Sequence, residues 1–321
     1  MVAIRFIILT CVVLLMSLIR KNEDIIHISQ IPTILSSNHN DIVLVGEIHS
    51  IKSLSQVYEL INIYLDNRNI DTIFYENPYS NYVWYIVTKS QFSVYDRYRT
   101  LNDNKNLIYN VDVEVDLPTF MRAIQLVLKA NNLKNTPIYL ESKLIIKDYY
   151  KFSEGNEFQG KLGLLKFIND LEINIIPNLS LFKNELMILL SRIKDSVNLN
   201  LIDSPPVLKE RDSLMNKYVV EYVQQHNVKR WAGFFGSYHI AKKSDGIIND
   251  SINLEINFYN QLLKSNLELN SYMITRINLG LCDEIYTSNV VAKYENTCNE
   301  INKNQCIYFY HKDVNWFIFK K

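Results

Sequence analysis

Two apolar runs, each followed at once by Gly-x-x-His, constrain the fold of this chain most strongly. Residues 41–45 lead into the motif Gly46–His49, and residues 229–235 lead into Gly236–His239. The chain has only 8 Gly and 6 His, so chance rarely places this pair at the end of an apolar run. In α/β sheets, ligands bind outside the carboxyl ends of buried strands. The two motifs therefore predict a site at one edge of such a sheet.

The remaining hydrophobic pattern predicts how the sheet is completed. Strands are expected at 41–45, 70–75, 106–113, 229–235, 272–279, 307–311 and 316–319, and helices at 51–67, 79–98, 117–133, 138–152, 162–175, 179–197 and 204–225. Residues 25–40 are interpreted as a connector. Strands that alternate with helices predict an α/β fold with a mostly parallel sheet flanked by helices. Within it, about 135–205 is expected to form a helical insertion that covers the site.

The first residues form a segment of their own. Phe6 to Ile19 are almost uninterrupted apolar residues, with Arg5 before them and Arg20 and Lys21 after them. This length suits a signal peptide better than a spanning helix, which needs about 20 residues. No clean cleavage site follows, so an uncleaved anchor and a buried N-terminal helix or strand are the alternatives.

We expect residues 1–21 to be a signal peptide or membrane anchor that contacts the membrane. Residues 22–321 are then a single α/β domain, and the protein is exported or membrane-anchored. In that setting, two of Cys282, Cys298 and Cys306 would pair and one would stay free. The alternative is that all three are ordinary small apolar residues.

Charge and motifs limit the partners. The 34 basic and 34 acidic side chains balance, so no basic face for nucleic acid is expected. Phosphate-binding glycine loops and the Gly-x-Ser-x-Gly elbow of serine hydrolases are absent from the sequence. We expect a small-molecule or peptide substrate.

Carboxylates and imidazoles follow four of the predicted strands. Glu47 and His49 follow the first, Glu76 the second, and His239 the strand at 229–235. Because the carboxyl ends of parallel strands share one edge, these side chains are expected to meet. Asp112 and Glu114, after the third strand, are secondary candidates, since a single polar residue there is usually a turn or a cap.

Such a set of residues can activate water in two ways. His49, Glu76 and His239 can hold a divalent metal (Mn, Co, Fe or Zn) that lowers the pKa of bound water. Without any cofactor, His49 with Glu47 or Glu76 can take the proton from water, while His239 or an arginine stabilises the oxyanion or supplies a proton. Both routes lead to hydrolysis of an ester, lactone or amide.

Arg211 lies near the start of the helix that precedes the strand at 229–235. We expect the N-terminal end of that helix at the sheet edge opposite the carboxyl ends. Geometry alone therefore gives Arg211 no role in the site.

Taken together, Gly46–His49, Glu76 and Gly236–His239 resemble the superfamily that joins erythromycin esterases, Tiki proteases, TraB-type proteins and ChaN-like haem-binding proteins. Residues 110–114 are similar to the Gly-x-Asp-x-Glu strand of the esterase branch, and 211–215 resemble its Arg-Asp-x-x-Met helix. The resemblance covers about 41–240, with an unmatched middle. It implies that His49, Glu47, Glu76 and His239 line the active site, with Arg211 as a supporting charge.

The same resemblance leaves a binding function as the alternative. A ChaN-like protein would hold haem or an iron compound in this crevice, and tyrosines offer axial ligands. The tyrosines considered are Tyr79, Tyr82, Tyr85, Tyr95 and Tyr98. A third reading, an interaction module that has lost the chemistry, is opposed by the presence of both histidines and the glutamates. The hydrolase is the preferred interpretation.

Overall fold

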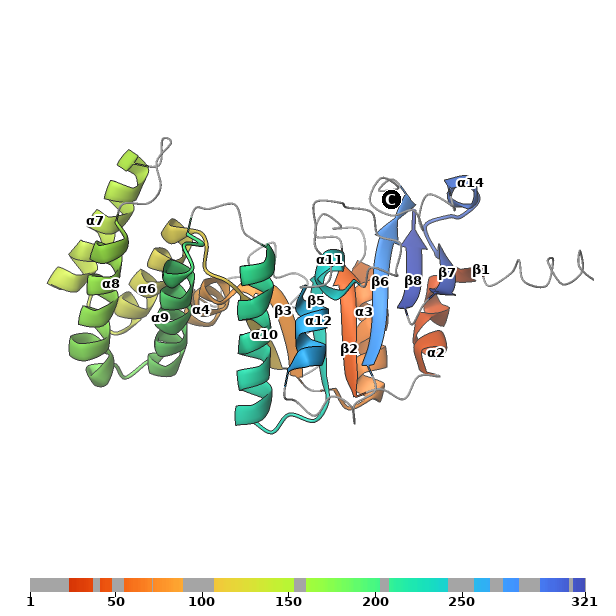
Figure 1. Ribbon diagram of the computed structural model, residues 1–321, viewed down its shortest axis with the longest axis horizontal. Helices are drawn as coiled ribbons and strands as arrows, with labels where there is room; N and C mark the ends of the chain where they lie inside the picture. The colour runs from red at the N-terminus through yellow and green to blue at the C-terminus, as the bar shows by residue number, and fades with distance from the viewer. Residues whose placement is uncertain are drawn as a thin grey trace, which may run out of the picture.

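An eight-stranded sheet forms the centre of the computed structural model, in the order β1-β7-β8-β6-β2-β5-β3-β4 (Figure 1). The structure describes residues 23–36, 41–47, 55–70, 72–88, 107–152, 160–202, 208–241, 257–265, 274–282, 295–311 and 314–320. The strands are β1 (Glu23–His27), β2 (Ile42–Glu47), β3 (Thr72–Pro78), β4 (Leu107–Asp112), β5 (Trp231–Gly236), β6 (Ile274–Leu281), β7 (Gln305–His311) and β8 (Val314–Phe319). Strand β7 pairs antiparallel with both of its neighbours, and the other pairs are parallel. The expected mostly parallel α/β sheet is confirmed.

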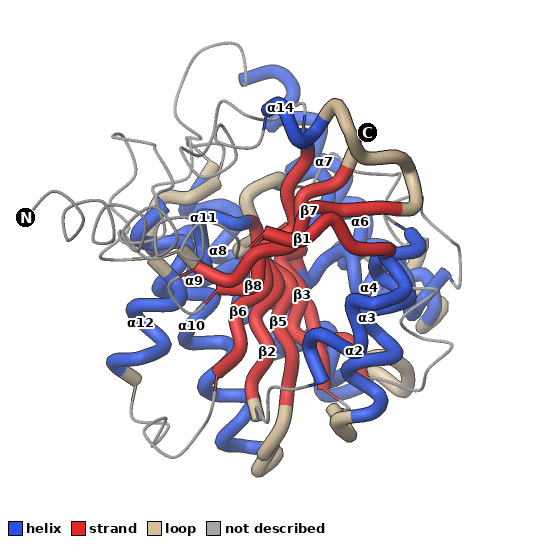
Figure 2. Tube along the Cα trace, turned by 90° about the vertical axis from the view of Figure 1, so that its right-hand side faces the viewer, coloured by secondary structure: helices blue, strands red, loops and turns tan. Residues whose placement is uncertain are grey.

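Helices cover both faces of this sheet (Figure 2). The helices are α2 (Ile31–Ser36), α3 (Ser55–Asn67), α4 (Tyr79–Thr88), α6 (Leu117–Ala130), α7 (Pro137–Phe152), α8 (Lys161–Asp170), α9 (Lys183–Asn198), α10 (Leu208–Gln225), α11 (Ser237–Ile240), α12 (Phe258–Lys264) and α14 (Glu295–Cys298). Short turns of other helix types are η1 (Ile28–Gln30), η4 (Leu171–Ile175) and η5 (Ile176–Asn178).

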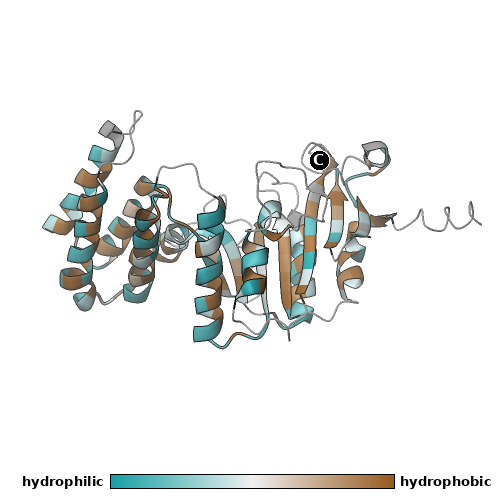
Figure 3. Ribbon diagram, viewed as in Figure 1, coloured by the Kyte–Doolittle hydropathy of each residue, from teal (hydrophilic) through white to brown (hydrophobic). Residues whose placement is uncertain are grey.

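Two hydrophobic cores account for the layered arrangement. On one face, Val43 and Val45 of β2 pack with Ile61 of α3. On the other face, Leu44 of β2 packs with Met215 of α10 and residues of α12. Side chains alternate between the two faces of a strand, and parallel strands buried on both faces are apolar throughout. The brown colour of the central strands in Figure 3 reflects this pattern.

The segment at 25–40, interpreted above as a connector, is in fact structured. It contributes β1, η1 and α2, and β1 pairs antiparallel with β7 at the edge of the sheet. This strand was missed because β1 is only five residues long and an edge strand shows a weaker apolar pattern than a central one.

A helical unit lies beyond the β3–β4 end of the sheet (Figure 1). Helices α4, α6, α7, α8 and α9 share a separate hydrophobic core that includes Phe120, Phe167 and Leu189. Asp116 is the N-cap of helix α6, where its carboxylate accepts the backbone N–H of Thr119, and Pro118 occupies the first turn. The helices expected at 135–205 belong to this unit, and α9 reaches the end of β4.

The N-terminal end of helix α10 lies at the carboxyl edge of the sheet and not at the opposite edge, where it was expected. A helix that leads into a strand of a parallel sheet runs antiparallel to that strand, so its first turn lies at the carboxyl edge. The contacts of Arg211 with Glu76 and Asp112 place it there. The expectation that Arg211 lies at the opposite edge is therefore wrong.

The expected leader at 1–21 lies outside the described residues. Within the described part of the chain, no helix is both long enough and apolar enough to cross a membrane.

One disulfide joins the end of β6 to α14. Cys282 and Cys298 are bonded across a sequence separation of 16 residues, with their Cα atoms 5.7 Å apart, and Cys306 is buried and free. Two of the three clustered cysteines therefore pair and one stays free, which is the first of the two alternatives given above.

Replacing Cys282 and Cys298 together by Ala should lower the free energy of unfolding by about 3 kcal/mol, because the bridge closes a loop of 16 residues. Urea denaturation of the oxidised protein and the variant measures this difference. Alkylation of the unfolded, unreduced protein should label Cys306 but neither partner of the bridge, and labelling of all three would contradict the pairing. Because disulfides persist in oxidising compartments, the same labelling on cells tests the expectation of export.

Candidate active site

Glu76 lies in a bulge at the carboxyl end of β3. The pairing of β3 with β4 shifts between Tyr75, opposite Asn110, and Pro78, opposite Asp112. Two residues of β3 therefore face one residue of β4, which is the pattern of a β-bulge. Bulges re-aim side chains and occur next to active sites. Here the bulge places the carboxylate of Glu76, whose side chain is only 1% exposed.

The carboxylate of Glu76 accepts hydrogen bonds from three directions. Its Oε2 accepts the backbone N–H of Gly236, the last residue of β5. Its Oε1 accepts from Nη2 of Arg211 at 2.6 Å and lies 3.0 Å from Nε2 of His239. Elements β3, β5, α10 and α11 thus converge on one buried carboxylate.

Arg211 joins Glu76 to the end of β4. Its Nε and Nη2 donate to the two oxygens of Asp112, at 2.7 and 2.6 Å. Such two-point pairing with a carboxylate orients the planar guanidinium. Burial alone would lower the pKa of Arg211, but Asp112 and Glu76 outweigh it and raise that pKa. Arg211 therefore stays charged.

His239 is held between two carboxylates. Helix α11 starts directly after β5, so the second Gly-x-x-His turns back over the sheet edge. Nδ1 of His239 contacts Oδ1 of Asp212, and Nε2 contacts Oε1 of Glu76. When both carboxylates are ionised, they can only accept hydrogen bonds, so both ring nitrogens donate and the ring is an imidazolium.

The electrostatics agree with this protonation state. Burial by itself lowers the pKa of His239, whereas Glu76 and Asp212 raise it by more, to about 10. Asp212 is fully buried, and burial raises its pKa against the lowering effect of His239. Its second oxygen accepts the backbone N–H of Phe258 at 2.9 Å, which anchors the pair to α12.

The glycine of the first motif is required by packing. A Cβ on Gly46 would lie 2.0 Å from Oδ1 of Asn278 and 2.9 Å from Cδ1 of Ile240. Side chains from β6 and α11 therefore fill the space beside Gly46. Glycine is needed here because these side chains approach the backbone too closely for a Cβ atom.

The structure brings together four of the residues predicted from sequence: Glu76, Asp112, Arg211 and His239. His49 and the side chain of Glu47 lie outside the described part of the chain. The backbone of Glu47 ends β2 and pairs in register with Gly236, so the strands that carry the two motifs end side by side.

Glu114 has a supporting position instead of a place in the cluster. Its carboxylate accepts the backbone N–H of Ser80 at 2.8 Å, in the first turn of α4. Burial raises the pKa of Glu114 to about 7, in spite of the lowering effects of Ser80 and Arg192. It therefore caps a helix, as expected for a lone strand-end carboxylate.

Asp212 is the site residue that sequence reasoning missed. In the sequence it stands out only as part of the Arg-Asp-x-x-Met segment. The spacing of Asp212, Met215 and Val219 is a sequence signal for burial, because it puts the three residues on one helical face. In the structure all three are fully buried. A carboxylate on an apolar helix face needs a cationic partner.

The described donor set does not fit a divalent metal. Both oxygens of Glu76 already accept N–H donors, and the imidazolium of His239 has no free lone pair for a metal. Among the described residues, no group of three or more His, Cys, Asp or Glu could hold a metal ion. We derive no catalytic step through a metal.

The tyrosines proposed as haem ligands lie on α4 or outside the described residues. Tyr79 is buried in the core of the helical unit, beside Tyr82 and Tyr109. Tyr82 and Tyr85 are half-buried on the same helix, α4. Tyr95 and Tyr98 lie outside the described residues.

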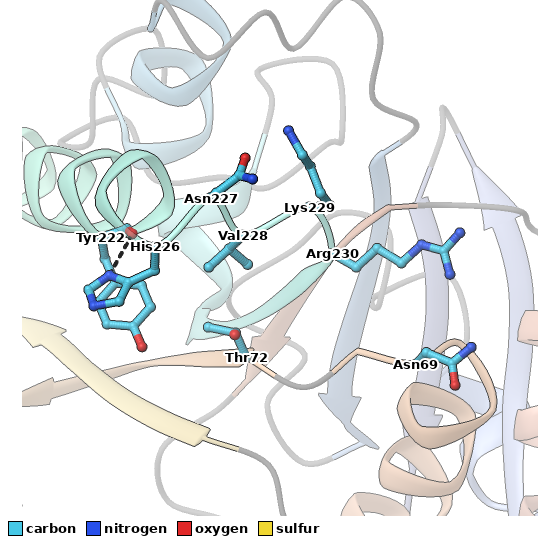
Figure 4. Close-up of a pocket in the computed structure, with 8 residues that line it drawn as sticks. All are labelled: Asn69, Thr72, Tyr222, His226, Asn227, Val228, Lys229 and Arg230. Atoms are coloured by element: carbon cyan, nitrogen blue, oxygen red, sulfur yellow. Dashed lines mark hydrogen bonds between the residues drawn. The ribbon is translucent and has the colours of Figure 1, made fainter.

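A cavity of about 420 Å³ opens at the opposite edge of the sheet (Figure 4). Its walls include Thr72 at the start of β3, Tyr222 and His226 near the end of α10, and Lys229 and Arg230 just before β5. It contains none of the predicted site residues, so it is separate from the candidate active site.

Comparisons with known proteins bear on the fold. No family model matches the chain, and no curated protein matches it significantly. Among solved structures, a Bacillus cereus protein is similar at 15% identity and a TM-score of 0.50, covering 78% of this chain and 68% of that one.

Two further structures fall just below that TM-score. A variant of the erythromycin esterase EreC in its open conformation has 12% identity and a TM-score of 0.49, covering 81% of this chain and 77% of that one. A succinoglycan biosynthesis protein has 15% identity and a TM-score of 0.48, covering 78% and 69%. At such identities the similarity concerns the fold alone.

The charge of His239 makes stability depend on pH. Its folded pKa of about 10 lies above the ordinary value of 6.5, so its stabilisation is fully present below about pH 6.5 and is lost as the pH rises towards 10. The free energy of unfolding of the wild type should fall more steeply between about pH 7.5 and pH 10 than that of His239→Gln. The pH range begins above the raised pKa of Glu114, which is about 7. Titration of Glu114 therefore contributes little to the slope.

Urea denaturation at several pH values gives both slopes. NMR of the His239 ring should show an imidazolium at pH values where a free histidine is neutral. Parallel pH dependences for the two proteins, together with a neutral ring, would refute the charged assignment.

Proposed function

We propose that this protein is a hydrolase that cleaves an ester, lactone or amide bond at the carboxyl edge of the sheet. The observation that carries the proposal is the ring of His239 held between the carboxylates of Glu76 and Asp212, beside the guanidinium of Arg211 that Glu76 and Asp112 hold. Fixed cations at a sheet edge can stabilise the negative charge that develops when water attacks a carbonyl group. The sequence motifs shared with erythromycin esterases support the same reaction class.

The division of roles follows from the hydrogen bonds. His239 donates through both ring nitrogens and so cannot act as the base. Glu76 already accepts from Gly236, Arg211 and His239, which leaves it poorly suited to take a further proton. We therefore assign the general base to His49, the histidine of the first motif.

The reaction then needs no covalent intermediate. His49 takes one proton from water as the water oxygen bonds to the carbonyl carbon. The tetrahedral intermediate collapses with cleavage of the bond from that carbon to the alcohol oxygen or amine nitrogen. The proton on His49 passes to the leaving group, so the products are an acid and an alcohol or amine.

Arg211 has a free donor for the oxyanion. Its Nε and Nη2 are engaged by Asp112 and Glu76, while Nη1 has no hydrogen-bond partner among the described residues. The side chain of Arg211 is 21% exposed, against 1% for Glu76. Its outer nitrogen is therefore the described group best placed to meet the carbonyl oxygen of a substrate.

Arg211→Lys should lower kcat by about 10²–10³-fold, because one amine cannot hold Asp112 at two points and also present a donor. His49→Ala should lower it by about 10²–10⁴-fold, as expected for loss of a general base. The assay uses p-nitrophenyl esters, erythromycin as a macrocyclic lactone, and a peptide. Lys209→Ala, an exposed change on the same helix, is the matched control and should leave kcat unchanged. Full activity in either site variant would refute its role.

Hydrolysis should persist in EDTA, since the described site residues are already paired with one another through ion pairs and hydrogen bonds. Elemental analysis of the protein and of the double variant His49→Ala, His239→Ala checks this independently. Stoichiometric Mn, Co, Fe or Zn that disappears in the double variant would replace this mechanism with a metal-dependent one.

A further inference from the structure

A buried arginine lies at the junction between the helical unit and the sheet. Arg192 of α9 is only 2% exposed. Its Cζ lies 4.5 Å from the ring centroid of Tyr79, 5.0 Å from that of Tyr109 and 4.2 Å from that of Tyr218. These three rings belong to α4, β4 and α10. The charge is thus enclosed by aromatic faces from three elements.

This charge has no carboxylate partner at ion-pair distance among the described residues, and its Nη2 is buried without a hydrogen-bond partner there. Burying such a group is costly even with aromatic neighbours. A buried apolar side chain would fill the same space without that cost. Within the described part of the chain, the side chain of Arg192 makes one hydrogen bond, and it is therefore informative: Nη1 donates to the backbone carbonyl of Asn110.

The hydrogen bond from Arg192 to Asn110 can affect both β4, which carries Asp112, and β3, which carries Glu76. Asn110 lies on β4, two residues before Asp112, which holds Arg211. Its side-chain Nδ2 donates to the carbonyl of Pro78 at 3.0 Å, across the bulge that contains Glu76. A shift of Asn110 would therefore displace Asp112 and the bulge together.

Helix α9 makes a second contact on the other side of Asp112. The hydroxyl of Ser196 accepts the backbone N–H of Glu114 at 3.1 Å. Arg192 and Ser196 are four residues apart and so lie on the same face of α9. That face holds residue 110 of β4 and residue 114, two residues after β4 ends, with Asp112 between them in the sequence.

Attachment of α9 to α10 does not require Arg192. Asp195 pairs with Nζ of Lys217 at 2.7 Å and accepts from the hydroxyl of Tyr218 at 3.2 Å. These contacts already join the two helices at a more exposed position. The hydrogen bond of the buried guanidinium is made to β4.

We propose that Arg192, with Ser196, clamps the carboxyl end of β4 and is a positioning residue that sets Asp112 and Glu76 for the active site. Arg192 touches no substrate in this role and acts through Asn110. Only the kinetic part of the test rests on the hydrolase function proposed above.

The first test is spectroscopic and needs no substrate. In Arg192→Met, which keeps bulk but removes the charge and the donors, the backbone amide proton of Gly236 should move upfield and exchange faster, because its acceptor Glu76 is displaced. The amide of Phe258, bonded to Asp212 away from β4, is the internal reference and should not move. Lys217→Met, which loosens α9 from α10 only, should change neither signal.

An unchanged Gly236 signal in folded Arg192→Met would overturn the proposal and leave Arg192 a packing residue. If Arg192→Met does not fold, Arg192→Lys decides, since it keeps a charge but lacks the planar fork that reaches Asn110 between aromatic rings. The Gly236 signal should then shift in the same direction, and a wild-type signal would again overturn the clamp.

The second test is kinetic. Misplacement of a reacting group by about 1 Å lowers rates by up to about 10²-fold, so kcat of Arg192→Met should fall about 10–100-fold with KM almost unchanged. Wild-type kcat in folded Arg192→Met would contradict the role of the clamp in catalysis. Absence of hydrolysis in the wild type would refute the proposed function, while the Gly236 signal would still decide the clamp.

Discussion

The buried carboxylate of Glu76 is the interaction on which the rest of the site depends. It belongs to β3, yet it binds the end of β5 through Gly236, α10 through Arg211 and α11 through His239. A buried charge is tolerated only when it is paired and hydrogen-bonded. The three partners satisfy that need, and in doing so they fix the relative positions of four elements. The second Gly-x-x-His motif is held in place by this requirement.

The charges around Glu76 also decide the state of His239. Glu76, Asp112 and Asp212 are three carboxylates, and Arg211 provides one fixed positive charge among them. A second cation lowers the remaining electrostatic repulsion, which is why the imidazole keeps its proton in spite of burial. A histidine at a strand end is commonly taken as a base, but these surroundings make His239 a fixed cation. The two histidine motifs are therefore expected to have different tasks.

The helical unit and the sheet contribute differently. The sheet edge presents the charged groups, while α9 contacts the chain on both sides of Asp112, at Asn110 of β4 and at Glu114 just after the strand. The helical unit has its own core, so a movement of that unit would reach the active site through β4. This arrangement connects a part of the chain that carries none of the predicted catalytic residues to the geometry of the candidate site.

Much of this protein could be predicted from local sequence patterns. Hydrophobic periodicity determined the parallel α/β class and most elements, because the spacing of apolar residues within a segment shows which face of that strand or helix is buried. The two Gly-x-x-His motifs and Glu76 indicated the edge of the sheet at which Glu76, Asp112, Arg211 and His239 meet, because residues that follow parallel strands gather at one edge. The short edge strand β1 and the direction of α10 were not recovered, because pairing partners and chain direction are long-range properties.

Only the tertiary structure decided which polar groups pair. The separation between Arg211 and Asp112, 99 residues, or between Glu76 and Gly236, 160 residues, leaves no trace in local pattern. The same holds for Asp212. In the sequence it resembles an ordinary charged residue of a helix, and only the structure shows its contact with His239 of α11. Residue types and spacing determined where chemistry is located, whereas the protonation of His239 and the orientation of Arg211 depend on distances of a few ångströms that only the packed fold sets.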